Sequence, residues 1–461
     1  MKKKILPLVF ALSSLPTIAY GAEGPSISSV VQSVDMMWVA IATLLVFFMH
    51  AGFAMVETGF TRAKNALNIL MKNFLTMALG ALIYFAIGYG IMFGDSLSGL
   101  VGSSYFFLQN AENDIGFFVF QAVFAATCAT IISGAVAERM KLSSYLMLTV
   151  CMVMFIYPVV GHWVWGGGFL SELGFIDFAG STVVHLTGAT GALAAVLLLG
   201  GRIGKYDQKT VNVIPGHNIP LGALGVFILW FGWFGFNAGS SLAADPALVP
   251  MIITTTLLSA SAGIVSSAIY SYIKFKQMDA TLTLNGALGG LVGITAGTAD
   301  VSFFGAVAIG FIAGIILIEA VPFIDQKLKL DDPVGAIAVH GFCGIWGTIA
   351  VGLFATNGGL LYGGGTALLV VQSIGVLAVI AWTFGLTFLS LKFITLRSSI
   401  RVSREEEVQG LDFTEHGSTA YDMKGESFGP ANSQSSFGYG LVNRLNQLGN
   451  ADHQPHNYNS N

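Results

Sequence analysis

The stretch that decides the fold is DFAGSTVVHLTGATGALAAVLLLG, which covers residues 177–200. After Asp177 it contains no Asp, Glu, Lys or Arg, and a helix of this length rises about 36 Å, enough to cross the hydrocarbon core of a bilayer. His185 is its one ionisable ring. A lone buried histidine is usually a structural group bonded to a neighbour, whereas ionisable groups inside membranes are commonly functional. The rest of the sequence decides between these two interpretations.

The composition is that of a membrane protein. Of the 461 residues, 54% are hydrophobic and only 10% are charged, whereas soluble domains contain about 25% charged residues. The formal net charge is −4, and no nucleic-acid partner is expected. Cys128, Cys151 and Cys343 all fall inside apolar segments, so we expect free thiols rather than disulfides.

Apolar segments of spanning length recur along the chain. We predict an all-α polytopic membrane protein with about eleven spanning helices, at residues 36–59, 74–93, 117–136, 145–166, 178–199, 221–238, 251–272, 280–297, 301–323, 333–355 and 367–393. The loops after the odd-numbered segments up to the ninth contain Lys or Arg, and the loops after the even-numbered segments contain neither. Because positively charged loops stay in the cytoplasm, the N-terminus is expected outside and the C-terminus inside.

The two ends of the chain differ from this spanning region. Lys2, Lys3 and Lys4 precede a short apolar stretch, so residues 1–21 are expected to be a signal peptide and residues 22–35 an exported N-terminal segment. Residues 36–396 form the predicted transmembrane domain, and residues 397–421 form a cytoplasmic tail of mixed charge. Residues 422–461 are rich in Asn, Ser, Gln and Gly and are expected to be disordered.

The first ten predicted helices divide into two halves of five. Because five is odd, the halves are inverted relative to each other, as in many transporters whose sites lie near the midplane. The fifth helix of each half begins alike: His185 comes eight residues after Asp177, and His340 comes eight residues after Asp332. Each Asp is suited to cap its helix, and a rise of about 12 Å carries both rings to a similar depth. We therefore predict that the two histidines line a shared pore.

A metal or haem site is the alternative for these two rings. No predicted span contains two histidines, and His50 is a possible third ligand without an acidic neighbour at short spacing. Neutral rings that offer hydrogen bonds along a narrow path are the favoured interpretation. We expect no metal, no cofactor, no catalytic residue and no enzymatic activity.

Aromatic residues lie near the predicted outer ends of three helices, and in two of these motifs glycines flank them. FQAVFAAT contains Phe124, HWVWGGG contains Trp165, and GWFGFNAGS contains Trp233, Phe236 and Ser240. A single aromatic residue at a membrane interface is usually an anchor, but neighbouring glycines allow close approach. Aromatic faces attract cations, a serine hydroxyl can accept a hydrogen bond, and the outer loops carry no Lys or Arg. The motifs indicate an external site for a small monovalent cation.

Together these features resemble the ammonium transporter family (Amt/Rh), in its bacterial Amt branch. The resemblance covers residues 34–421 and rests on RAKNALNILMKN, GAVAER, HWVWGGG, DFAGSTVVH, GWFGFNAGS, NGALGGLVGITAG, DDPVGAIAVHG and GLDFTEHGSTAY, in that order. It implies eleven helices with inverted five-helix repeats, a homotrimer with one pore per subunit, and the bacterial cytoplasmic (inner) membrane. It also implies that ammonium, or its analogue methylammonium, is bound outside and deprotonated, and that ammonia is conducted into the cytoplasm.

The resemblance also implies roles for individual residues. The external ammonium site matches Phe124, Trp165 and Ser240; the phenyl gate matches Phe124 and Phe236; and the paired pore histidines match His185 and His340. Supporting positions match at Asp177, Trp233 and Thr295. A regulatory tail pattern matches at Gly410, Asp412, His416 and Tyr421, and a PII-type protein is a possible partner at the cytoplasmic face.

The chain departs from the family's usual pattern at the inner end of the first helix. VETG stands at residues 56–59 where many relatives have Phe-Tyr-Gly-Gly, and His50 stands where an amide is frequent. Glu57 is either a functional acid or a partner of the nearby Arg62.

Two functional alternatives use the same fold. The first is an ammonium sensor, which would ordinarily carry an output domain. The second is an Rh-type channel for NH3 or CO2, which is disfavoured because Trp165 and Ser240 complete the cation site.

Overall fold

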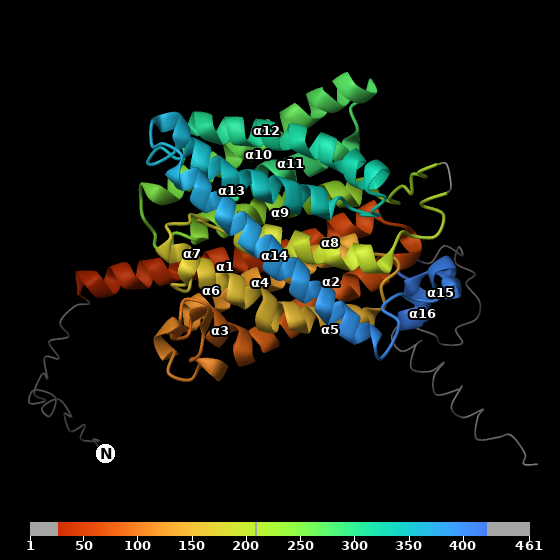
Figure 1. Cartoon of the computed structure of the whole chain (residues 1–461), viewed down its shortest axis with the longest axis horizontal. Coiled ribbons are helices and arrows are strands. Elements are labelled where there is room, and N and C mark those ends of the chain that lie inside the picture. The colour runs from red at the N-terminus through yellow and green to blue at the C-terminus, as the bar shows by residue number, and fades with distance from the viewer. Residues whose placement is uncertain (1–25, 208–209, 422–461) are drawn as a thin grey trace, which may run out of the picture.

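The computed structural model describes residues 26–207 and 210–421. The signal peptide expected at residues 1–21 and the extension expected at residues 422–461 lie outside this part of the chain. Within it, ten helical stretches are long and apolar enough to cross a membrane, and α11 (Ala280–Thr295) is a shorter apolar helix. Figure 1 shows these helices lying side by side. The prediction of an all-α polytopic membrane protein is confirmed.

The elements follow one another in a simple order. The spanning helices are α1 (Ile27–Phe60), α2 (Ala66–Ile83) with α3 (Tyr89–Phe93), α4 (Ile115–Ala135), α5 (Leu142–Cys151) with α6 (Tyr157–Val164), α8 (Thr187–Leu199), α9 (Ile219–Gly239), α10 (Leu248–Phe275), α11, α12 (Phe303–Pro322), α13 (Cys343–Phe354) and α14 (Ala367–Thr395). π-helical turns lie at Tyr84–Gly88, Met152–Ile156 and Phe323–Lys327, and two more, η6 (Ser181–Leu186) and η8 (Ile337–Phe342), lead into α8 and α13. The short elements are α7 (Phe169–Glu172), α15 (Arg404–Gln409), α16 (Leu411–His416), an antiparallel hairpin of β1 (Ser96–Leu97) and β2 (Val101–Gly102), and 3-10 turns at Ala63–Asn65, Phe106–Leu108, Glu112–Asp114 and Leu360–Tyr362.

Helix α1 begins earlier than the predicted start at residue 36. Ser26 caps it, because its hydroxyl oxygen accepts a hydrogen bond from the Ser29 N–H at 3.1 Å. Part of the segment expected to precede the first span, from Ile27 on, is therefore helical. The serines and Asp35 in this stretch interrupt the apolar pattern from which the span was predicted.

The first helices of the two halves, α1 and α9, pack closely through glycines. A Cβ atom on Gly59 would lie 2.4 Å from the backbone N of Gly222, and one on Gly225 would lie 2.5 Å from the backbone N of Val56. These positions have no room for a side chain, so the glycines set the helix separation. Figure 1 shows α10 to α13 on one side of this pair and α2, α3, α5 and α6 on the other, with α14 crossing in front.

Buried ion pairs join the cytoplasmic loops. The Glu138 carboxylate accepts hydrogen bonds from Arg62 and Arg202, and Arg202 also donates to both oxygens of Asp331, at 2.8 and 2.9 Å. Burial alone would raise the pKa of Asp331, but its hydrogen bonds with Arg202 and that residue's charge lower it to about 2. Arg62 is therefore paired with Glu138. The alternative that Arg62 pairs with Glu57 is wrong, because the loop after α1 turns Arg62 toward the α4 end.

Candidate functional site

A cavity of about 320 Å³ lies at the outer end of the bundle. It brings together Phe124 from α4, Trp165 from the end of α6 and Ser240 from the end of α9. The Trp165 Nε1–H donates to the Asp177 carbonyl oxygen at 2.8 Å, which fixes the indole ring. The Ser240 hydroxyl donates to the Phe236 carbonyl oxygen at 2.9 Å, which leaves its own oxygen as an acceptor. The cavity thus offers aromatic faces and a neutral oxygen, a combination suited to a cation that carries N–H donors.

Two phenyl rings close the inner end of this cavity. Phe124 and Phe236 stack with 4.0 Å between their centroids and 15° between their planes, and both are buried. The edge of Phe124 faces Trp165 at a centroid distance of 6.3 Å. No polar group belongs to this pair of rings, so a molecule that passes them leaves water behind.

Below the phenyl rings, the two histidines contact each other directly. His185 Nδ1 lies 3.2 Å from His340 Nδ1, and the rings stack with centroids 5.2 Å apart. A hydrogen bond between like nitrogens requires one ring to donate and the other to accept, so two neutral rings must be opposite tautomers. The ring of Phe236 lies 5.4 Å from that of His185, which makes the aromatic path continuous from the outer cavity to the histidine pair.

Trp233 holds His185 from the side. The indole stacks on the imidazole at 5.0 Å and 20°, and its Nε1–H donates to the Thr295 hydroxyl at 2.9 Å. Thr295 in turn donates to the Leu291 carbonyl oxygen within α11. Both predicted support residues therefore orient the ring pair.

The two aspartates that precede the histidines cap their helices in the same way. Asp177 accepts hydrogen bonds from the N–H groups of Gly180, Thr182 and Val183, at 2.8 to 2.9 Å. Asp332 accepts from the N–H groups of Gly335 and Ile337, at 3.1 and 2.7 Å. Gly180 and Gly335 have φ values of +111° and +79°, which let the chain turn sharply around each carboxylate. Asp177 does not line the outer cavity, as predicted from its capping role.

Comparison with known proteins agrees with this arrangement. The sequence matches the Ammonium Transporter Family over residues 37–421. It is 45% identical over 414 residues to ammonium transporter Amt2 of Archaeoglobus fulgidus. The aligned region covers 84% of this chain and 88% of that relative. The chain belongs to the ammonium transporter family. It is also 43% identical over 411 residues to a putative ammonium transporter of Synechocystis sp., with 86% of this chain and 91% of the relative covered.

Solved structures of ammonium transporters have the same fold. A protein described as "Sensor Amt Protein" superposes with a TM-score of 0.82 at 41% identity, covering 85% of this chain and 100% of that one. Saccharomyces cerevisiae Mep2 superposes with a TM-score of 0.76 at 27% identity, covering 81% and 88%. The chain is therefore a multi-pass membrane protein of a transporter family rather than of an enzyme family.

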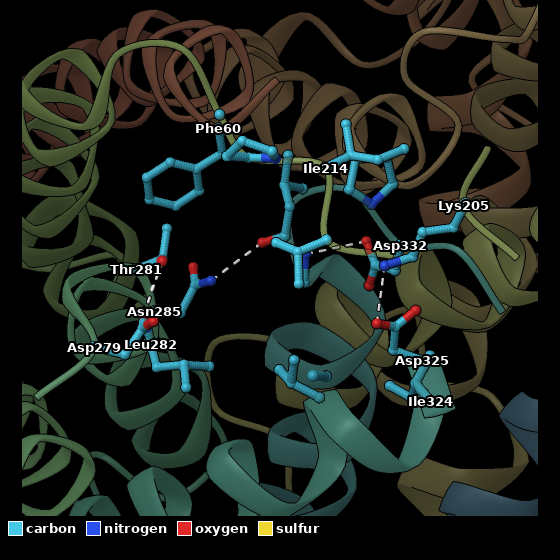
Figure 2. Close-up of a pocket in the computed structure, with 18 of the residues that line it drawn as sticks. Phe60, Lys205, Ile214, Asp279, Thr281, Leu282, Asn285, Ile324, Asp325 and Asp332 are labelled. Atoms are coloured by element: carbon cyan, nitrogen blue, oxygen red, sulfur yellow. Dashed lines mark hydrogen bonds and ion pairs between the residues drawn. The ribbon is translucent and has the colours of Figure 1, made fainter. Parts of the chain in front are cut away.

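Two cavities lie on the inner side of the histidine pair in this ammonium transporter. The first, of about 20 Å³, is lined by His340, Glu57 and Asn285 among others. The second, of about 430 Å³, opens at the cytoplasmic end and shares Asn285 and Val334 with the first. Figure 2 shows it between Asn285 with its neighbours Asp279 and Thr281 on one side and the ion pair of Lys205 and Asp325 on the other. We call the larger cavity the cytoplasmic vestibule.

His50 does not join the histidine pair through any hydrogen bond. Neither of its ring nitrogens has a hydrogen-bond partner among residues 26–207 and 210–421, and its nearest aromatic neighbour is Phe53, at 6.5 Å. Over the same residues, no three His, Cys, Asp or Glu side chains are grouped so that they could hold a metal ion. The structure gives no support to His50 as a third ligand.

The predicted tail residues lie against the cytoplasmic loops of their own subunit. The Asp412 carboxylate accepts from the Asn68 N–H at 2.9 Å, His416 Nε2 lies 3.2 Å from Asn68 Nδ2, and the Tyr421 hydroxyl lies 3.0 Å from His217 Nε2. Gly410 has a φ of +108°, and a Cβ atom there would lie 2.6 Å from the Lys64 carbonyl oxygen. Nearer the start of the tail, Arg401 pairs with Glu407 and Ser403 forms a capping box with Glu406. These contacts hold the tail against the cytoplasmic side of its own subunit.

Sequence reasoning missed Gln121. Its side chain lines the outer cavity, and its Oε1 atom is buried without a hydrogen-bond partner among the described residues. The signal was present in FQAVFAAT, because Gln121 precedes Phe124 by three positions and therefore lies on the same helix face. Gln121 is therefore a lining residue of the outer cavity, although its Oε1 atom is buried and does not face the open space.

Asp177→Asn should destabilise the transporter more than the same change at an exposed helix cap. The donors at Asp177 are divided between its two oxygens, whereas both donors at Asp245 bind Oδ1 alone. Since Asn has one side-chain oxygen, it can keep the bonds at position 245 but not all of those at 177. We expect Asp177→Asn to lower the free energy of unfolding by about 1–3 kcal/mol, and Asp245→Asn to leave the melting temperature unchanged. Thermal unfolding in detergent measures both, and equal melting temperatures would contradict the capping role.

Proposed function

We propose that the protein binds ammonium at the outer cavity, removes its proton, and conducts ammonia past the histidine pair into the cytoplasm. One observation carries this proposal. Phe124, Phe236, His185 and His340 follow one another at ring distances of 4.0, 5.4 and 5.2 Å, between an outer aromatic cavity and an inner vestibule. Relatives that are 45% and 43% identical are named as ammonium transporters, which supports the same substrate here.

Recognition at the outer cavity rests on aromatic faces and a neutral oxygen. Ammonium is attracted to the faces of Trp165 and Phe124 and can donate an N–H group to the hydroxyl of Ser240. A cation without N–H donors gains the attraction of the rings but makes no directed hydrogen bond. The external site of the proposal therefore consists of Phe124, Trp165 and Ser240.

Deprotonation follows from the cost of moving charge into the bundle. Placing a charge at the centre of a bilayer costs at least about 2.5–3.5 kcal/mol, and the stacked pair of Phe124 and Phe236 contributes no polar atom to offset it. Ammonia is neutral and avoids this cost. Potassium has no proton to lose, so the same barrier gives selectivity for ammonium.

The histidine pair supplies hydrogen-bond partners for ammonia after it has passed the rings of Phe124 and Phe236. With one Nδ1 donating to the other, the pair can accept a hydrogen bond from ammonia and pass a proton along itself by exchanging tautomers. Trp233, bonded to Thr295, stacks on His185 and keeps the imidazole ring in the orientation that this proton exchange requires.

The setting of this activity is the bacterial inner membrane, as a homotrimer with one pore in each subunit. Exposed apolar side chains on several spanning helices, among them Phe74, Phe227 and Leu377, suit contact with lipid or a neighbouring subunit. The docked tail and the cytoplasmic loops beneath it are the surface at which a PII-type protein would bind.

An ammonium sensor is the second candidate. It is favoured by one comparison, because a solved structure 41% identical to this chain is described as a sensor. The same external site would then report ammonium without net transport. Ammonium-dependent current, or methylammonium uptake in a cell without its own transporters, distinguishes the two: uptake above the background of the empty cell supports transport, and its absence with intact binding supports sensing.

Replacing either histidine with alanine should lower selectivity. Each variant loses the Nδ1 to Nδ1 bond, and about 1.4 kcal/mol of lost hydrogen bonding corresponds to a tenfold change. We expect the ratio of ammonium to potassium flux to fall about tenfold in His185→Ala and in His340→Ala. The double variant should fall little further, because both single changes remove the same interaction. Wild-type ratios in both single variants would exclude the proposed role of the pair.

Trp165→Ala and Ser240→Ala should each weaken ammonium recognition. We expect a loss of about 0.5–2 kcal/mol in apparent affinity, the range of one cation–π contact or one hydrogen bond. Ser241→Ala is the matched control, because the Ser241 hydroxyl donates to the Ala238 carbonyl oxygen and does not line the cavity. The measurement is the concentration dependence of the initial current. The assignment of the external site is rejected if Ser240→Ala behaves like Ser241→Ala and Trp165→Ala like the wild type.

Deleting the chain from Arg404 should lower transport and leave the trimer in the membrane. The deletion removes α15 and α16 and with them the contacts to Lys64 and Asn68. Deleting only the residues after Tyr421 is the control and should leave the rate unchanged. Initial uptake, normalised to the amount of inserted trimer, compares the two. Full activity of the longer deletion would mean that the docked tail does not regulate the pore.

A further inference from the structure

An acidic side chain lies beside the inner end of the pore, where the family's usual pattern has none. Glu57, on α1, is 2% exposed and lines the small cavity of about 20 Å³ together with His340. A cavity of this volume holds about one water molecule, or one ammonia of similar size. Because Asn285 and Val334 also line the cytoplasmic vestibule, the small cavity lies between the histidine pair and that vestibule.

The structure holds the Glu57 carboxylate in a fixed position. The Ser133 hydroxyl on α4 donates to Glu57 Oε2 at 2.7 Å. A Cβ atom on the neighbouring Gly134 would lie 3.4 Å from Glu57 Cγ and 2.5 Å from Val334, so the arm of Glu57 packs against bare backbone at this point. A carboxylate fixed by one hydrogen bond and close packing is positioned rather than mobile.

A buried lysine provides the countercharge without touching the carboxylate. Lys72, on α2, is fully buried; its Nζ donates to the Ser133 carbonyl oxygen at 3.1 Å and lies 5.5 Å from the centre of the Tyr145 ring. Ser133 therefore lies between the two charges, since its hydroxyl binds Glu57 and its carbonyl binds Lys72. Within the described residues, Glu57 has no cation within 4.0 Å. Arg62 forms its ion pair with Glu138 instead. A buried pair held apart in this way leaves the carboxylate able to exchange a proton.

We propose that Glu57 is the proton-transfer group at the inner end of the pore. The proposal rests on the proposed function and adds the inner acceptor of its proton. A proton on a His340 ring nitrogen moves to a Glu57 oxygen across the single water or ammonia molecule held in the small cavity, which takes the proton from His340 and gives one of its own to Glu57. The histidine returns to its neutral form and the carboxylate becomes a carboxylic acid. The acid then gives its proton to ammonia or water in the vestibule, which restores the carboxylate and yields ammonium or hydronium inside.

The groups that face Glu57 come from three elements. Lys72 faces it from α2 across Ser133 of α4, and His340 faces it from η8 across the small cavity. Lys72 is also within the electrostatic influence of three more distant charged residues, Glu138, Arg139 and Glu415. Burial of Glu57 favours the neutral acid and the positive charge of Lys72 favours the carboxylate, so the two influences oppose each other at the transfer group.

The test measures two quantities on the purified trimer in proteoliposomes: the charge moved after an ammonium pulse, and the uptake of radiolabelled methylammonium. In Glu57→Gln, Ser133 can still donate to the amide oxygen, so the local packing is kept. We expect the charge moved per molecule taken up to fall at least about tenfold, while uptake down a concentration gradient continues. Glu57→Asp keeps a carboxylate on a shorter arm and should recover part of the lost charge.

A matched control separates this role from a general effect of removing a carboxylate. Glu319→Gln removes a half-exposed carboxylate that pairs with Lys274 on α10, away from both inner cavities, and should leave charge and uptake unchanged.

A wild-type charge ratio in Glu57→Gln overturns the proposal. So does a parallel loss of charge and uptake at a constant ratio, which is the behaviour of a merely structural pair. If Glu57→Gln does not fold, the ratio is measured in Glu57→Ala, which also removes the carboxylate, and a wild-type ratio there overturns the proposal. A wild-type protein that takes up methylammonium without moving charge overturns this proposal only, whereas one that takes up none overturns the proposed function.

Discussion

Two capping carboxylates determine where the pore residues lie. Hydrocarbon offers no partner to a free backbone N–H, so a helix that starts inside a membrane bundle has to be capped by the protein itself. Asp177 and Asp332 both bind the N–H groups three and five positions further on. Each cap fixes the start of a helix, and the two helices enter from opposite sides of the membrane. The histidines eight residues beyond the caps consequently meet at 3.2 Å.

The same caps connect the histidines to the rest of the path. The Asp177 side chain caps the helix of His185, while its carbonyl oxygen accepts the hydrogen bond of Trp165. One residue thus fixes both the outer aromatic cavity and the inner ring. On the other side of His185, the stacked Trp233 is tied to α11 through Thr295. The path therefore depends on helix ends and ring stacking, with few charged groups along it, as the cost of charge in hydrocarbon requires.

The features that the sequence predicts correctly are those that depend on spacing along the chain. The eleven apolar segments follow from hydropathy, and the inversion of the two halves follows from the odd number of helices in each. The contact of His185 with His340 follows from equal spacing after two aspartates. The partner of Glu57 could not be predicted, because Arg62 lies closer in sequence while the fold turns it toward Glu138. The small inner cavity and the unpaired oxygen of Gln121 depend on how several helices pack, which no single segment encodes.

The inner side of the pore and the docked tail share one helix. Near its start, α2 carries Asn68, whose backbone N–H binds Asp412 and whose side chain binds Glu415 of the tail. One turn further, the same helix carries Lys72, the cation across Ser133 from Glu57. Residues four apart lie on one face of a helix, so the side chain that binds the tail and the countercharge of Glu57 project from the same face of α2. Helix α2 is therefore the element that connects the docked tail with the charges beside His340.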